Sequence, residues 1–310
     1  MQFVVEAGGK IYEITEIIKS ISWNDRLNDG CSKLEFTCID SDLKIENGSD
    51  ISFKYNGIGI FFGYVFKHNR NSKGEISAIA YDQLRYAKAK DYLFIKKDKL
   101  TDIVNKMCTH FNFKKSHIAD TKYVLKEQAF DGDTWLDISY TGISETLMNT
   151  GKKYCLRDEF GEIALRDLED LSLNLIIGDE SLCYEYSHEK SIDDEFYNQI
   201  LFLVEGENKN TQFIGSKDDA SIKKYGLLQY YESISNSNAS KAKAKADSLL
   251  KLYNRETETL TLECLGDNRI RAGSSFYIYI SDLKLKNRVY VKSVTHEFIP
   301  VHKMSIEVAL

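Results

Sequence analysis

The sequence predicts a β-rich α+β protein in which strand-rich segments at both ends, each a candidate small β-barrel, flank a mixed α+β middle region. Short runs of alternating polar and apolar residues near both ends, helical periodicity in between, and an echo between the two ends support this fold class. Aromatic residues, which favour strands, are plentiful, with 19 Tyr and 16 Phe. Pro300 is the only proline, so turns must depend on Gly, Asn, Asp and Ser. We expect domains at residues 1–95, 96–205 and 206–310.

The first 95 residues contain strand patterns separated by turn signals. Gly8-Gly9 and Asn56-Gly57 each lie between two such patterns and predict hairpins. Between Lys33 and Ile39, apolar residues alternate with polar ones, as in a half-buried strand. The expected strands cover residues 1–6, 11–14, 21–23, 33–39, 51–55, 58–67 and 75–81. So many short strands favour a small barrel or sandwich.

The middle region changes to helical spacing. Apolar residues from Leu100 to Phe111 predict an amphipathic helix, with Asp98 as its N-cap. The other expected elements are a helix over 136–152 that ends at Gly151, a hairpin around the turn 158–161, and strands at 182–186 and 196–205. Strands and helices therefore mix in this part of the chain.

The C-terminal part combines one helix with strands. An apolar stripe from Ala239 to Tyr253 predicts a helix with Ser237 or Asn238 as its N-cap. The expected strands cover 257–264, 275–280, 289–298 and 304–309.

Two short motifs recur near the two ends of the chain. Gly48-Ser49 precedes an alternating strand and lies 16 residues before Tyr64-Val65. Gly273-Ser274 also precedes one and lies 17 residues before Tyr290-Val291. From the pattern alone, a duplicated β-domain and a coincidence both remain open.

Charge and composition exclude several classes of protein. The net charge of −6 argues against nucleic-acid binding, which needs a basic face. The N-terminus has no basic segment followed by an apolar core, and no run approaches the roughly 18 apolar residues of a membrane span. We therefore expect synthesis in the cytoplasm without a signal peptide, and no membrane partner. The six cysteines are scattered, which predicts reduced thiols.

No catalytic or metal-binding pattern emerges from the sequence. The six histidines form neither HExxH nor a paired HxH, and GxSxG is absent. The carboxylates Asp131 and Asp133, or Asp193, Asp194 and Glu195, are the best material for a glycosidase pair or a Ca²⁺ loop. Neighbouring carboxylates on one loop rarely face each other across a cleft, so a solvated turn or a helix cap is favoured. We expect no enzyme activity, no cofactor and no metal.

Motifs throughout the chain nevertheless resemble one known family. These motifs are the stretches 151–154, 158–163, 191–194, 197–198, 225–229, 254–255, 265–267, 270–273 and 290–298. They resemble the baseplate hub proteins of contractile phages, defective prophages and phage-tail-like bacteriocins of Gram-positive bacteria. The similarity spans nearly the whole chain.

The C-terminal motifs suggest a structural part and no functional site. Gly266-Asp267 predicts a tight turn, and Gly273 predicts a second turn that leads into the following strand. His296 and Phe298 alternate with Glu297, so their side chains should share one face of a sheet. Arg271 belongs to the same set of motif residues.

The resemblance implies a homotrimer in which each chain contributes two related barrels to a pseudo-sixfold ring. Such a ring joins the sixfold tail tube to the threefold central spike, within a baseplate that also contains wedge proteins. The expected function is therefore structural, in an assembled tail or tail-like particle. Two alternatives remain open: a tail-associated peptidoglycan hydrolase, and a spike or tube-initiator protein of a secretion-type injection machine.

Overall fold

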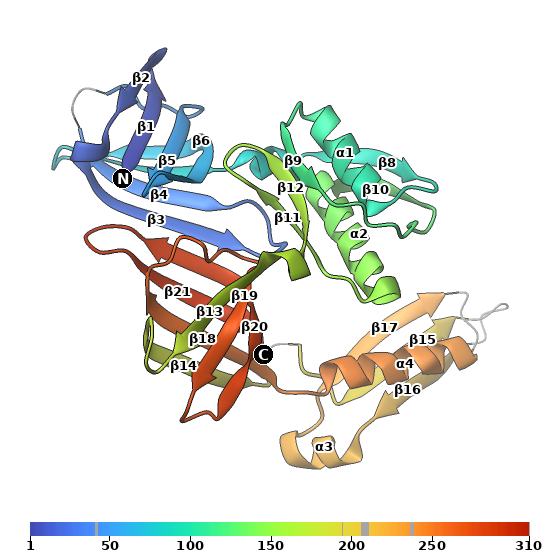
Figure 1. Ribbon diagram of the computed structural model, residues 1–310. Coiled ribbons are helices and arrows are strands. Elements are labelled where there is room, and N and C mark those ends of the chain that lie inside the picture. The colour runs from blue at the N-terminus through green and yellow to red at the C-terminus, as the bar shows by residue number, and fades with distance from the viewer. Residues whose placement is uncertain (41–42, 194, 206–210, 236–238, 310) are drawn as a thin grey trace. The chain divides into compact units, whose positions relative to one another are not determined.

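The computed structural model describes residues 1–40, 43–193, 195–205, 211–235 and 239–309 (Figure 1). The chain divides into two compact units. Unit 1 comprises residues 1–187 and 261–310, and unit 2 comprises residues 188–260. Unit 2 is thus an insertion in the sequence of unit 1. The division at residues 95 and 205 stays a prediction about independently folding parts.

The strands are β1 (Gln2–Ala7), β2 (Lys10–Glu13), β3 (Ile18–Arg26), β4 (Lys33–Ile39), β5 (Asp50–Tyr55), β6 (Ile58–Arg70), β7 (Glu75–Tyr81), β8 (Lys90–Ile95), β9 (Lys115–Ile118), β10 (Gln128–Thr134), β11 (Tyr154–Asp158), β12 (Ile163–Asp167), β13 (Ser172–Gly178), β14 (Cys183–Ser191), β15 (Gln199–Glu205), β16 (Thr211–Lys217), β17 (Gln229–Ser235), β18 (Thr257–Leu265), β19 (Ser275–Ile280), β20 (Leu285–Glu297) and β21 (Lys303–Ala309). The helices are α1 (Leu100–His110), α2 (Trp135–Thr150), α3 (Asp219–Tyr225) and α4 (Ala239–Tyr253), with 3₁₀ turns η1 (Thr15–Ile17), η2 (Gln83–Lys88) and η3 (Leu168–Leu171).

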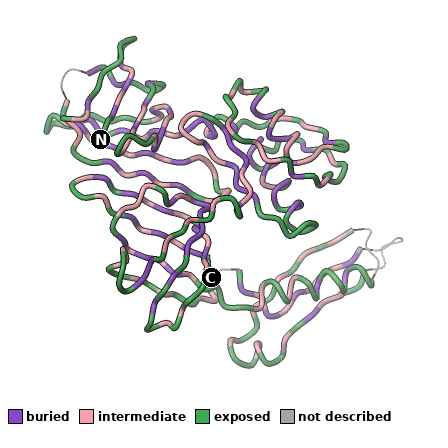
Figure 2. Tube along the Cα trace, in the orientation of Figure 1, coloured by how far each residue is buried: buried purple, intermediate pink, exposed green. Residues whose placement is uncertain are grey.

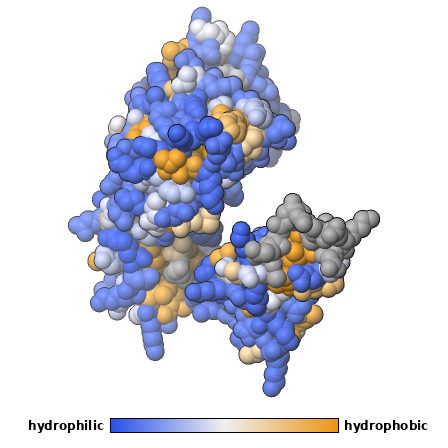
Figure 3. All heavy atoms as spheres, turned by 90° about the vertical axis from the view of Figure 1, so that its right-hand side faces the viewer, coloured by the Kyte–Doolittle hydropathy of each residue, from blue (hydrophilic) through white to orange (hydrophobic). Residues whose placement is uncertain are grey.

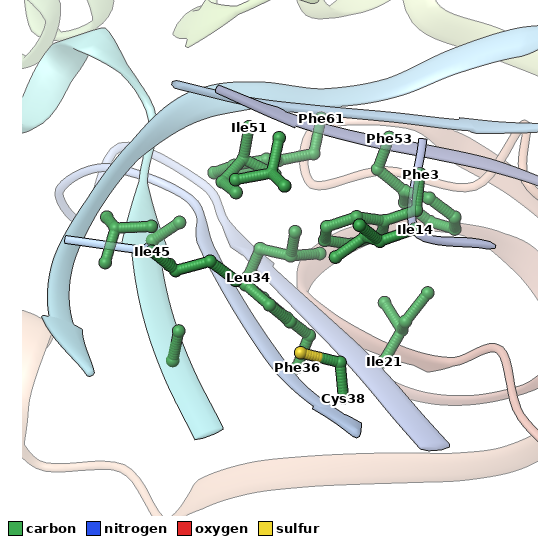
Figure 4. Close-up of a cluster of buried hydrophobic side chains, with 14 of the residues drawn as sticks. Phe3, Ile14, Ile21, Leu34, Phe36, Cys38, Ile45, Ile51, Phe53 and Phe61 are labelled. Carbon is green, nitrogen blue, oxygen red and sulfur yellow. The ribbon is translucent and has the colours of Figure 1, made fainter. Parts of the chain in front are cut away.

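The first β-rich part of unit 1, here called the N-terminal β-domain, consists of six strands in the order β3-β4-β7-β6-β5-β1, with β2 beyond β1. Its sheet curls around one core of buried apolar side chains (Figure 4). Phe3 on β1 and Phe36 on β4 have ring centroids 4.8 Å apart, although three strands separate them in the sheet. The curl explains the alternating burial along these strands, visible in Figure 2.

The second β-rich part, here called the C-terminal β-domain, repeats this strand order. Its strands follow one another as β14-β18-β21-β20-β19-β13. Strands β5, β6 and β7 correspond to β19, β20 and β21 in order and pairing, and β6 and β20 both contain 13 residues. β13 and β14 come from before residue 205, while the other four strands come from the last 54 residues. The β-rich fold class and the pair of related β-domains are confirmed.

The rest of unit 1 is a small α+β region. Strands β8 and β10 pair, and β11, β12 and β9 form a second small sheet. Helices α1 and α2 share a core with β11 and β12. α2 is capped by the Thr134 side chain, which accepts a hydrogen bond from the Asp137 N–H, and it ends at Gly151 with φ of 75°. This confirms the predicted end of the second helix.

The predicted N-cap of α1 is wrong. Asp98 accepts a hydrogen bond from the Lys96 N–H at 3.1 Å and so stabilises the turn before the helix. The N-cap is Lys99, whose N–H donates to the Asp102 carboxylate at 2.8 Å. The acidic side chain at the third helical position thus accepts a hydrogen bond from the N-cap N–H, which is one half of a capping box.

Unit 2 is a three-stranded sheet packed against one helix. Its strands lie in the order β16-β15-β17. Ala242 and Ala246 of α4 are buried against Ile200, Phe202 and Val204 of β15. The helix confirms the apolar stripe seen in the sequence, whereas its predicted caps, Ser237 and Asn238, lie outside the described residues. Strands β8, β9, β10, β13, β16 and β17 and helix α3 were not predicted from the sequence.

Candidate functional site: the junction of the two β-domains

The strongest candidate for a functional feature is the place where the two β-domains join. β3 pairs antiparallel with β20, from Ser22 opposite Glu297 to Arg26 opposite Ser293. Two backbone hydrogen bonds extend the ladder, from the Leu27 N–H to the Lys292 carbonyl at 2.8 Å and from the Phe298 N–H to the Ile21 carbonyl at 3.0 Å. The two β-domains are therefore parts of one continuous sheet.

A column of aromatic rings crosses this ladder. The Trp23 ring stacks on His296 with centroids 5.4 Å apart, and His296 stacks on Phe298 at 5.8 Å. Phe298 in turn stacks on His302 at 4.5 Å. This confirms that His296 and Phe298 share one face of the sheet. The column joins a β3 side chain to the C-terminal β-domain by apolar contact.

The hydrogen bonds of His296 hold it as a neutral ring. Its Nε2 lies 2.9 Å from the Ile270 carbonyl oxygen, which can only accept, so Nε2 carries the proton. Its Nδ1 then accepts from His302 Nε2 at 3.0 Å. Burial lowers the pKa of His296 to about 4, and burial lowers the pKa of His302 as well.

Gly266 is needed because the His302 ring occupies the place of a side chain. A Cβ on Gly266 would lie 2.1 Å from that ring. The Gly266 N–H also donates to the His302 carbonyl at 2.8 Å. Next in the chain, the Asp267 carbonyl accepts from the Ile270 N–H at 3.1 Å, which closes the predicted tight turn. Hydrogen bonds from Arg269 lower the pKa of Asp267.

Arg271 ties the same turn to β3 by a buried ion pair. Its Nε donates to Asp25 Oδ2 at 3.0 Å, and its guanidinium lies 5.0 Å from the centre of the Trp23 ring. The Ala272 N–H donates to the same carboxylate oxygen at 3.3 Å. The Asp25 side chain is only 5% exposed. A charge this deeply buried must keep its partner, so Arg271 and Asp25 lock the two β-domains together.

Two further buried carboxyls connect the N-terminal β-domain to the α+β region. Asp82 accepts from the N–H and the hydroxyl of Ser32, at 2.7 and 2.8 Å. Asp158 accepts from the Gly161 N–H at 2.6 Å and from Gln83 Nε2 at 3.0 Å. Burial, and for Asp82 also the charge of Asp158, raises the pKa of both carboxyls. Their oxygens are occupied by protein donors, which favours a structural role.

The repeated Gly-Ser and Tyr-Val motifs form the same turn in both β-domains. The Gly48 N–H donates to the Val65 carbonyl at 2.7 Å, and the Val65 N–H donates to the Ser49 carbonyl at 2.9 Å. Gly273, Val291 and Ser274 repeat the same two bonds at 2.9 and 2.8 Å.

Two further features of this turn also recur. The hydroxyls of Ser49 and Ser274 each accept from the N–H three residues earlier, at 3.2 Å in both cases. A bulge follows in both long strands, after Val65 in β6 and after Val291 in β20. This agreement of hydrogen bonds and register decides between duplication and coincidence in favour of duplication.

The acidic residues singled out in the sequence do not gather into a site. Asp131 and Asp133 lie in β10 on either side of a bulge at Gly132, which has φ of 83°. The expected turn is therefore wrong for these two residues, because Gly132 allows the strand to continue. Asp193 lies after β14, where its N–H donates to the Ser191 hydroxyl at 3.0 Å, and Asp194 lies outside the described residues.

Within the described ranges, no group of three or more His, Cys, Asp or Glu side chains could hold a metal ion. Among the same residues, no helix is both long and apolar enough to span a bilayer. The cysteines there are all free thiols.

The sequence motifs identify one side of the junction and miss the residues that it contacts. Gly266, Asp267, Arg271, Gly273, His296 and Phe298 were singled out, and all six lie at or next to the junction. Their partners Trp23, Asp25 and His302 were missed. Arg271 and Asp25 are 246 residues apart in the chain, so no local pattern could have joined them.

The sequence matches the model of a known protein family. The model of the YQBQ-like family matches residues 21–309, which is nearly the whole chain. The chain belongs to the YQBQ-like family.

Relatives of this YQBQ-like chain include the phage-like element PBSX protein XkdQ of Bacillus subtilis (strain 168). The two are 27% identical over 269 residues, which cover 85% of this chain and 82% of XkdQ. Among solved structures, the fold matches the 43 kDa tail protein of prophage MuSo2 from Shewanella oneidensis with a TM-score of 0.70. That match covers 100% of this chain and 98% of the other, at 13% identity.

The fold also matches the Escherichia coli c3393 protein with a TM-score of 0.53, at 10% identity, covering 98% of this chain and 76% of that one. That protein is described as a type VI secretion component with structural similarity to the T4 phage tail proteins gp27 and gp5. The resemblance to phage-tail proteins drawn from the sequence motifs is confirmed at the level of the family.

Proposed function

We propose that this protein is the structural hub of a contractile phage-tail baseplate or a related tail-like particle. The duplication of the β-domain within one chain carries the proposal. A threefold assembly of such chains would present six similar β-domains, and that arrangement can meet a sixfold tube on one side and a threefold spike on the other. The XkdQ relative, from a phage-like element, and the prophage tail fold support the same setting.

The junction gives each chain the rigidity that this role demands. Because β3 and β20 form one ladder, the two β-domains of a chain are held at a fixed angle to each other. The buried Arg271–Asp25 pair and the aromatic column make that angle costly to change. The partners we propose are two further copies of the chain, the tail tube protein, the central spike protein and baseplate wedge proteins.

A structural role fits the buried carboxyls better than catalysis does. On the face shown in Figure 3, hydrophilic residues predominate and the hydrophobic ones form small separate patches. Asp82 and Asp158, two buried carboxyls with raised pKa, accept hydrogen bonds from the protein itself. A wall hydrolase would instead need two carboxyls facing across an open cleft.

The test is the solution mass measured by light scattering, with and without the cognate spike protein. One chain weighs 35.6 kDa, so a trimer would weigh about 107 kDa. A threefold mass in either condition supports the hub. A monomer or dimer in both conditions contradicts it. Release of fragments from purified cell walls, abolished by Asp131→Asn or Asp133→Asn, would favour the hydrolase instead.

A further inference from the structure

The two β-domains differ at one sheet edge, which is paired in the C-terminal β-domain and unpaired among the described residues of the N-terminal one. The inference drawn from this edge rests on the proposed trimer. By their pairing register, residues Lys67–Arg70 of β6 are equivalent to Ser293–His296 of β20. Lys67 pairs with Ile79 of β7 just as Ser293 pairs with Glu307 of β21. In both strands these residues follow the same bulge.

In the C-terminal β-domain, this stretch of β20 has a neighbour on both sides. β21 pairs with one edge and β3 pairs with the other. In the N-terminal β-domain, β7 pairs with one edge of Lys67–Arg70, and no strand pairs with the other in the part of the chain that the structure describes. The four residues are exposed, whereas Val294 and His296 are buried.

The orientation of the β6 backbone shows which N–H groups point away from β7. The Asn71 N–H donates to the Glu75 carbonyl, on the side of β7. Since alternate residues of an antiparallel strand face the same neighbour, the N–H groups of His68 and Arg70 point to the free edge. The equivalent stretch of β20 faces β3 in the same way, as the bonds at Lys292 and Phe298 show.

The strand that corresponds to β3 has the complementary free edge. In the strand order of the two β-domains, β14 occupies the position next to β18 that β3 occupies next to β4. Within the described residues, β14 pairs with β18 alone, whereas β3 pairs with β4 and β20. Among the residues that the structure describes, each chain therefore has one β3-type edge and one β20-type edge without a strand partner.

We infer that β14 of one copy pairs antiparallel with Lys67–Arg70 of β6 in the next copy. This contact would repeat, between chains, the β3–β20 pairing inside each chain, so one kind of joint would recur six times around a threefold ring. Charge supports the choice of partner. The exposed Lys67 lies on the β6 edge, and the exposed Glu185 and Glu189 lie on β14. Pairing also covers two edges that would otherwise be open to aggregation.

Photo-cross-linking tests the contact in the whole protein. A benzoylphenylalanine at Lys67 should form cross-links to peptides from residues 183–191, identified by mass spectrometry. Trimers mixed from ¹⁵N-labelled and unlabelled chains distinguish links between chains from links within one. The same probe at the exposed Tyr12 of β2 is the control, and it should not reach these peptides.

A matched pair of substitutions tests the backbone bonds. His68→Pro removes an edge N–H without taking a bond from β7. His68→Ala keeps that N–H and removes the exposed side chain with its contact to Asn47 Oδ1 at 3.1 Å, which His68→Pro also removes. We expect His68→Ala to form the trimer as the parent does, and His68→Pro to weaken it by about tenfold or more at each contact. Circular dichroism and the melting temperature check that both variants are folded.

The outcomes separate the two proposals. A trimer whose Lys67 cross-links avoid residues 183–191, and which His68→Pro leaves intact, overturns the pairing and leaves the hub standing. A chain that stays monomeric alone and with the spike overturns both. If His68→Pro fails to fold, the cross-linking result alone decides the pairing.

Discussion

The two β-domains share a strand order but differ in what surrounds them. In the N-terminal β-domain, residues 27–32 connect β3 to β4, whereas between the corresponding β14 and β18 the chain makes most of unit 2. The turn at Gly48 is exposed, while the equivalent turn at Gly273 packs against Cys155. The framework of a duplicated domain is thus kept by its backbone hydrogen bonds, and each copy uses its loops and side chains for a different contact.

The largest effect on thermal unfolding should follow from removing unit 2, which is inserted in the C-terminal β-domain and has no counterpart in the N-terminal one. We predict that the full chain unfolds in two calorimetric transitions, because units 1 and 2 have separate cores. Replacing residues 192–256 by a short Gly/Ser linker should abolish one transition and leave the other nearly unchanged. A single transition in the full chain, lost entirely in the shortened one, would mean that unit 1 depends on its insertion.

The next largest effect should come from the buried ion pair of the junction. Arg271→Ala leaves the Asp25 carboxylate buried without its partner, which should lower the free energy of unfolding by about 3–5 kcal/mol. Arg269→Ala is the matched control. That residue is 57% exposed and pairs with Asp267, so its loss should cost less than about 1 kcal/mol. Urea unfolding followed by Trp fluorescence measures both, and equal costs would argue against a locked junction.

His296 should make stability depend on pH. Its folded pKa of about 4 lies below the unfolded value of 6.5, so the unfolded chain binds the proton more tightly. Its contribution is therefore complete above pH 6.5 and falls by about 2 kcal/mol on going to pH 5. His296→Gln should cost less stability at pH 5.0 than at pH 7.5, as measured by urea unfolding. His68→Ala, at an exposed position, is the control, and a pH-independent cost for His296→Gln would contradict the buried neutral ring.

The smallest effect should distinguish the two equivalent turns. Gly48 and Gly273 have φ of 93° and 85°, so alanine strains the backbone at both by about 1–2 kcal/mol. At Gly273 the new methyl would also lie 3.3 Å from Cys155 Sγ, whereas nothing lies within 4 Å at Gly48. Gly273→Ala should therefore lower the melting temperature further than Gly48→Ala does. The reverse order would mean that the two turns are not equivalent.

Except for β13, the sequence predicts the strands of the two β-domains well, because most of them alternate cleanly and are separated by Gly and Asn turns. It predicts the repeated turn only as a weak echo, because the evidence for it lies in backbone hydrogen bonds that many sequences can make. Strands such as β8, β10 and β13 were missed, since each has a mixed pattern and depends on pairing with distant residues. The partners of Arg271 and His296 lie on a strand far away in sequence, and only the fold brings them together.

Electron microscopy of the purified assembly, viewed along its axis, tests the trimeric hub most directly. We expect a ring of six similar β-domain densities with threefold and approximate sixfold symmetry. A particle with three lobes and no sixfold component, or a twofold assembly, would contradict it.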